Sequence, residues 1–94
     1  MKVFAIASPK VPLTPEQLKP HMPAEVRHTL QLYLDGKVEQ FWFQDKAGPI
    51  FLFDAASVEE VRATLDTLPL VAANLMTYQL LPVGPLMPLG RLIQ

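Results

Sequence analysis

Short runs of apolar residues along the chain have the length and composition of β-strands. One such run covers residues 2–7, and two more cover residues 37–44 and 49–54 on either side of a polar link of four residues. Aromatic and branched side chains fill the second and third runs, which favours a β-hairpin. A fourth strand is predicted over residues 74–81, before a segment rich in proline and glycine.

The alternation of side chains along the hairpin predicts a sheet that is apolar on both faces. In the first hairpin strand, regular alternation places Val38 and Trp42 on one face and Phe41 and Phe43 on the other. The second hairpin strand is apolar at odd and at even positions alike. Lys46, in the link between these strands, is expected to be a solvent-exposed turn residue.

The first helix is predicted to be bent or split near its start. Thr14 has the character of an N-cap, with a proline beside it and Gln17 three residues later, but two further prolines interrupt the segment that follows. The regular part is expected to run from Pro23 to Asp35, where Gly36 ends it. Its core-facing positions are predicted from helical spacing to be Val26, Leu30, Tyr33 and Leu34.

The second helix is predicted to start at Ser57. Ser57 and Glu60 form the pattern of a capping box. Apolar residues then follow at steps of three and four, and Pro69 is expected to end the helix. This stripe consists of Val58, Val61, Leu65 and Leu68.

The predicted order of elements is β-α-β-β-α-β, which is the ferredoxin-like α+β arrangement of an antiparallel sheet with two helices on one face. Two helices cover only one side of a sheet, and the other side is apolar too. We therefore expect that face to pack against a second copy of the chain in a homodimer. The whole chain, residues 1–94, is expected to be one domain, with an apolar tail over residues 81–94 that packs on the partner subunit.

Composition and charge exclude several classes of partner and chemistry. Half of the 94 residues are apolar, 18% are charged and the formal net charge is −1, with no basic cluster for nucleic acid. The absence of cysteine excludes thiolate catalysis and cysteine-ligated zinc. The apolar run near the start is too short for a signal peptide or a membrane span. These features predict a cytoplasmic protein without nucleic-acid or membrane partners.

One stretch resembles the muconolactone isomerase family. The matching residues lie between positions 53 and 70, and Trp42, six residues after Gly36, extends the match upstream. They are Phe53-Asp54, Ser57-Val58-Glu59, Thr64-Leu65 and Leu68-Pro69-Leu70. The resemblance implies a dimeric α+β barrel subunit, in some cases gathered into larger rings, that moves a double bond in a small lactone acid by proton transfer without a cofactor.

The resemblance also indicates where chemistry is expected and where this chain departs from the family. Glu25 falls where the isomerases have an acid on the first helix, but the lysine that stands beside it there is Val26 here. The strand around Trp42 carries arginine and histidine in the isomerases and no cation here. The chain therefore resembles the isomerases more closely in its expected fold than in its expected substrate site.

Five residues are candidates for the site. Glu25 and His28 are one helical turn apart and could act as a general base and its partner, or simply form an exposed pair. Trp42 and Tyr78 could bind a flat organic ligand by stacking and a hydrogen bond, or pack in the core. Glu39 is a second carboxylate that is either a base candidate or a solvated strand residue.

Metal and nucleotide chemistry are not expected. His21, Glu25 and His28 have the residue types of a two-histidine, one-carboxylate iron site, but Pro23 separates His21 from the regular helix. The chain has no phosphate-binding glycine loop, nucleophile elbow or His-Glu-x-x-His motif. No metal and no cofactor are predicted.

Three functions are consistent with these observations. The first is a cofactor-independent isomerase that acts on a small organic acid or lactone by proton transfer. The second is a non-catalytic dimeric module of the same fold that binds a small ligand. The third is a cofactor-free oxygenase of the same architecture, which follows from fold analogy alone.

Overall fold

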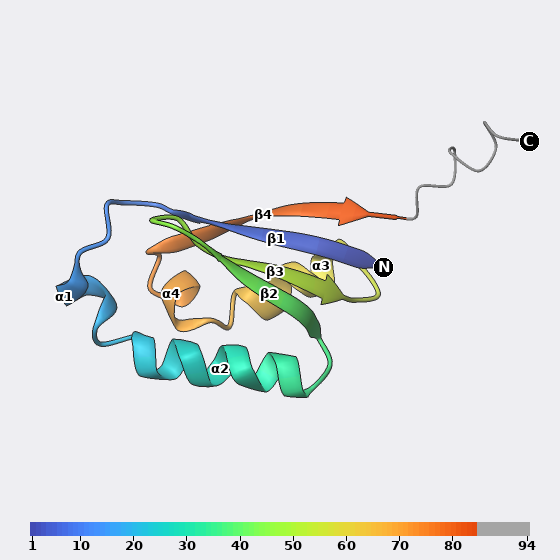
Figure 1. Cartoon of the computed structure of the whole chain (residues 1–94), viewed down its shortest axis with the longest axis horizontal. Coiled ribbons are helices and arrows are strands. Elements are labelled where there is room, and N and C mark those ends of the chain that lie inside the picture. Colours follow the sequence, from blue (N-terminus) through green and yellow to red (C-terminus); the bar gives the residue numbers. More distant parts are fainter. Residues whose placement is uncertain (85–94) are drawn as a thin grey trace, which may run out of the picture.

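A computed structural model describes residues 1–84 and places helices on one face of a four-stranded sheet (Figure 1). The longest helix, α2, runs along the helical layer, and α3 and α4 lie beneath the other strands (Figure 1). The elements follow in the order β1 (Lys2–Pro9), α1 (Pro15–Leu18), α2 (Met22–Leu34), β2 (Val38–Gln44), β3 (Gly48–Asp54), α3 (Val58–Leu65), α4 (Pro69–Ala72) and β4 (Met76–Val83).

The sheet has the strand order β2-β3-β1-β4, and every neighbouring pair is antiparallel. At its centre, Ala5 of β1 pairs with Phe51 on one side and with Leu80 on the other. With helices between β1 and β2 and between β3 and β4, this is the ferredoxin-like arrangement. The predicted fold class is confirmed.

The two faces of the sheet differ in burial. Val3, Ala5 and Phe51 point toward the helices and are fully buried, whereas Phe4 and Ile50 alternate with them and stay partly exposed on the outer face. The buried face forms the core together with apolar residues of α3 and α4. The outer face has no helix over it in the part of the chain described.

A β-bulge in β2 changes which side chains share a face. The register shifts between Val38 and Gln40, so that Val38 pairs with Phe53 while Trp42 pairs with Ile50. Val38 therefore lies on the buried face, and Trp42 on the outer face. The prediction that these two residues share a face was wrong, because one extra residue reverses the alternation.

The predicted core-facing stripe of α2 was also wrong. Val26, Leu30 and Tyr33 are about half exposed in the single chain and Leu34 is 74% exposed, whereas Glu25 and Leu32 are the buried residues of this helix. The buried face is thus displaced by one residue, which corresponds to a rotation of about 100° around the helix axis. Packing of α2 over β2 and α4 decides this rotation, and no local pattern in the sequence records it.

The segment between α3 and β4 contains a second short helix. Helix α3 starts as predicted, with the Glu60 amide donating to Ser57 Oγ at 3.1 Å, but it ends at Leu65. Leu68 is fully buried, as its place in the stripe suggests, and Pro69 is the first residue of α4 rather than a simple stop. Proline is tolerated there because the first turn of a helix needs no backbone N–H.

The last strand and the tail also differ from the prediction. Strand β4 begins at Met76 and runs through Val83, so residues 81–83 belong to the sheet and not to a tail. Pro82 is accommodated because β4 is an edge strand. The predicted packing of the tail on a partner concerns residues that lie mostly outside the described part of the chain. Among residues 1–84, no helix is long and apolar enough to cross a membrane.

Candidate functional site

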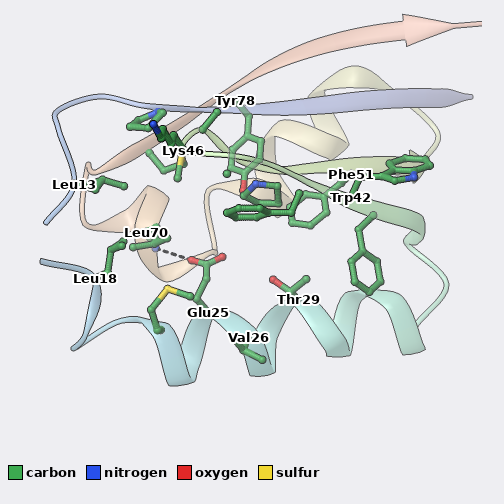
Figure 2. A pocket seen from close by; sticks show the side chains of 18 of the residues that line it. Leu13, Leu18, Glu25, Val26, Thr29, Trp42, Lys46, Phe51, Leu70 and Tyr78 are labelled. Carbon is green, nitrogen blue, oxygen red and sulfur yellow. Dashed lines mark hydrogen bonds between the residues drawn. The ribbon is translucent and has the colours of Figure 1, made fainter. Parts of the chain in front are cut away.

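A cavity of about 890 Å³ lies between α2 and the helix-facing side of the sheet, and Leu13 and Leu18 border it at one end (Figure 2). Its walls are mostly apolar, with Leu18, Phe51 and Leu70 among the lining residues. Besides the indole of Trp42, polar side chains come from only four of the described lining residues: Glu25, Thr29, Lys46 and Tyr78. A few polar groups in an apolar cavity are typical of a site for a small organic molecule.

Glu25 is the buried acid of this cavity, with only 7% of its surface exposed. Its Oε1 accepts a hydrogen bond from the backbone N–H of Leu70 at 2.9 Å, and Figure 2 shows the other oxygen turned toward the cavity. Leu70 lies in the first turn of α4, where backbone N–H groups have no partner within the helix. The carboxylate supplies that partner.

Burial raises the pKa of the Glu25 carboxyl above its ordinary value. The hydrogen bond from Leu70 and the positive charges of His28 and His21 act in the opposite direction, but they do not cancel the loss of hydration. A raised pKa makes the Glu25 carboxylate a stronger base than an ordinary glutamate, so it accepts a proton more readily.

Tyr78 projects from β4 into the same cavity. Its ring is buried and stacks on Phe51, with 5.7 Å between ring centroids and 20° between planes. Burial, and next the negative charge of Glu25, raises the pKa of the Tyr78 hydroxyl far above the physiological range. The hydroxyl therefore stays protonated and available as a hydrogen-bond donor. Figure 2 shows it pointing into the space between the sheet and α2.

His28 does not line this cavity. Its Nε2 lies 3.1 Å from Thr67 Oγ1, in a separate groove between α2 and α3. The Thr67 hydroxyl donates to the carbonyl of Thr64 at 2.6 Å, so it is placed to accept from the histidine ring. The two predicted catalytic residues are thus neighbours on α2 whose functional groups enter different pockets.

Two of the predicted ligand-binding residues also lie away from Glu25. Trp42 borders the cavity, but its ring packs against Phe4 on the outer face, with 6.2 Å between ring centroids. Glu39 is exposed on β2 and forms an ion pair with the side chain of Lys2. Of the five predicted site residues, Glu25, Trp42 and Tyr78 line the cavity, and only Glu25 and Tyr78 direct their functional groups into it.

The iron-type ligand set considered from the sequence is not assembled. His21 occupies the N-cap position of α2 without a side-chain capping hydrogen bond, and the ring of His28 is directed to Thr67. Within residues 1–84, no three histidine, aspartate or glutamate side chains gather closely enough to hold a metal ion.

Three contributors to the site were missed by the sequence analysis. Thr29 follows Glu25 by one helical turn, so helical spacing could have indicated it from the sequence. Lys46, interpreted as a solvated turn residue, lines the cavity because the hairpin turn lies over one end of it. The Leu70 amide could be anticipated only from a helix that starts at Pro69.

Comparisons with known proteins support the fold. No protein-family model matches the sequence, and no curated protein matches it either. Among solved structures, the chain is similar to 5-chloro-2-hydroxyhydroquinone dehydrochlorinase (TftG) from Burkholderia phenoliruptrix AC1100, solved in complex with 2,5-dihydroxybenzoquinone. The TM-score is 0.64 at 17% sequence identity, over 89% of this chain and 94% of that one. At this level of identity, the similarity is evidence for a shared fold alone.

Proposed function

We propose that the protein is a cofactor-independent enzyme that moves a proton on a small unsaturated organic acid or lactone, with migration of a double bond as the outcome. The observation that carries this proposal is the buried carboxyl group of Glu25 at the wall of an otherwise apolar cavity. The resemblance to the muconolactone isomerases around positions 53–70 supports the same class of chemistry, and the dehydrochlorinase that shares the fold is also an enzyme of a small ring compound.

The proposed reaction uses two groups of this chain. The Glu25 carboxylate removes a proton from a carbon next to the substrate carbonyl, and the electron pair of the broken C–H bond moves to the carbonyl oxygen. The Tyr78 hydroxyl donates a hydrogen bond to that oxygen while it carries negative charge. The Glu25 carboxyl then returns the proton to a different carbon, so the double bond shifts and no atom is gained or lost.

Deuterium incorporation tests this proposal directly. The wild-type protein is incubated in D₂O with muconolactone and with simple unsaturated lactones, and the substrate C–H signals are followed by proton NMR. We expect exchange with the wild type and a loss of at least about 100-fold with Glu25→Gln, because glutamine cannot accept the proton. Glu39→Gln is the matched control, since Glu39 is exposed and paired with Lys2; it should retain exchange.

The alternative is a non-catalytic module that binds a small ligand. It is favoured by the position of His28, whose contact with Thr67 leaves Glu25 without a titratable hydrogen-bond partner among residues 1–84. The same experiment separates the two functions. Lactones that bind in the cavity, seen by shifts of the Tyr78 and Phe51 resonances, without any exchange of their protons would support the module and reject the enzyme.

We further propose that two copies of the chain associate through the outer face of the sheet. Phe4, Trp42 and Ile50 lie on this face, and Trp42 is 47% exposed in the single chain. Contiguous exposed apolar side chains of this kind are characteristic of an interface. A symmetric pair that packs these faces together would bury them without a further element of the chain.

A further inference from the structure

The cavity that holds Glu25 also has one cationic group at its edge. Among the described residues that line it, Lys46 is the only one with a positive charge and Glu25 the only one with a negative charge. Figure 2 shows Lys46 on the sheet side of the cavity and Glu25 on α2 across from it. The two charges therefore lie on different walls of one space.

Lys46 is available to a ligand. Within residues 1–84 it takes part in no ion pair, whereas Lys2 is paired with Glu39 and Lys10 contacts Asn74. Lys46 is exposed, so its ammonium group keeps its hydration and carries no burial cost before a ligand arrives. An anion that reaches it from the cavity gains a charge-assisted hydrogen bond.

The backbone of the hairpin turn holds Lys46 in an uncommon conformation. Its φ is +64°, in the left-handed region that favours glycine or asparagine over lysine. The turn is closed by the Ala47 amide, which donates to the carbonyl of Gln44 at 3.1 Å. A lysine in this conformation strains the backbone of the turn, and backbone strain of this kind is concentrated at functional sites.

Part of the cavity wall is aromatic. The rings of Phe51 and Tyr78 stack with only 20° between their planes, and the remaining lining is largely apolar. Such a wall favours a planar ring over a branched aliphatic ligand.

From these observations we infer that Lys46 is the residue that selects for an anionic group on a ring compound bound in this cavity, by pairing with that group. The inference rests on the proposed function and deepens it, because it names the residue of the same site that holds the part of the substrate facing away from Glu25.

The test compares two compounds of nearly the same shape, benzoate and benzamide, by titration calorimetry with the full-length protein. We expect the wild type to bind benzoate about tenfold more tightly than benzamide, because only benzoate carries a charge for Lys46. The preference should fall as salt is added, since Lys46 is exposed. Lys46→Gln should remove the preference, and Lys46→Arg should keep it.

A matched control separates a local effect of Lys46 from the loss of one charge. Lys19→Gln changes the net charge by the same amount at an exposed position outside the cavity lining, and it should leave the benzoate preference unchanged. Equal binding of both compounds by the wild type, no binding of either, or an unchanged preference in Lys46→Gln would each overturn the inference.

Failure of this inference is distinguishable from failure of the proposed function. Glu25→Gln removes the proposed base but leaves Lys46 in place, so this variant should still prefer benzoate. A Lys46-dependent preference for benzoate in a protein that exchanges no lactone protons would keep the anion site and reject the catalytic role. Lactone proton exchange that requires Glu25 but is unchanged in Lys46→Gln would support the catalytic role and reject the anion site.

Discussion

Glu25 on α2 and Leu70 on α4 are joined by a buried hydrogen bond, in which the Leu70 amide donates to Glu25 Oε1 at 2.9 Å. The bond exists because Pro69 begins α4 and leaves the next amide without a partner inside the helix. It connects two elements that are far apart in the chain, and it orients the only carboxyl group that lines the cavity within the described residues.

This arrangement predicts a pH-dependent stability difference between the wild type and Glu25→Gln. Because burial raises the pKa of Glu25 in the folded state, the folded protein binds more protons than the unfolded chain as pH rises from about 4.3. The wild type therefore loses stability through this group between that pH and the raised pKa. Glutamine does not titrate and its oxygen can still accept from Leu70, so the variant should gain relative stability over this window.

Urea unfolding from pH 4 to pH 8 measures this difference. Contributions from all other titratable groups cancel when the two proteins are compared at each pH, provided that their environments are unchanged. The free energy of unfolding of Glu25→Gln minus that of the wild type should increase with pH and then level off. A difference that stays constant across this range would contradict the raised pKa.

A second prediction concerns the hydroxyl of Tyr78. Tyr78→Phe keeps the ring that stacks on Phe51 but removes the proposed donor to the substrate oxygen. We expect lactone proton exchange to slow by about 100-fold, with little change in KM, because the donor acts mainly on charge that develops during the reaction. The melting temperature serves as the control and should change little. Exchange at the wild-type rate would show that Tyr78 has no such role.

A third prediction compares two glycines that both have positive φ. Gly48 has φ +118°, and a Cβ there would lie 3.1 Å from the Cβ of Ala7, whereas Gly36 has φ +79° and open space around it. Gly36→Ala should cost about 1–2 kcal/mol from backbone strain. Gly48→Ala should cost about 1–3 kcal/mol more, because the added methyl group overpacks β1 against β3.

Unfolding by urea gives both values from one type of experiment. Circular dichroism of each variant before unfolding checks that the fold is retained. Equal costs at the two positions would mean that β1 and the start of β3 move apart easily, and would contradict the tight contact between Gly48 and Ala7.

A fourth prediction tests the association of two copies. Light scattering after gel filtration should give the mass of a dimer for the wild type. Trp42→Lys should shift the mass toward the monomer, because a charge on the outer face would be buried without a partner. Leu34→Lys makes the same change at a more exposed apolar residue on α2 and should remain dimeric. A monomeric wild type, or a dimeric Trp42→Lys, would reject this interface.

Local patterns in the sequence were sufficient for the order and approximate bounds of the main elements. Apolar runs, the Ser57 cap and glycine at the end of α2 act through neighbouring residues, so they predict strands, helix starts and helix ends without any tertiary information. Their order then leads to the ferredoxin-like sheet. Glu25 and Tyr78 were also candidates before the structure was known.

Tertiary structure alone decided which side chains meet. The rotation of α2 buries Glu25 in place of the apolar stripe that starts at Val26, and the bulge in β2 turns Trp42 to the outer face. The site also needs the Leu70 amide, which is 45 residues away from Glu25 in the chain, and the hairpin turn that carries Lys46. Periodicity describes a single element, whereas the rotation of a helix over a sheet depends on packing between elements, and the site is built from that packing.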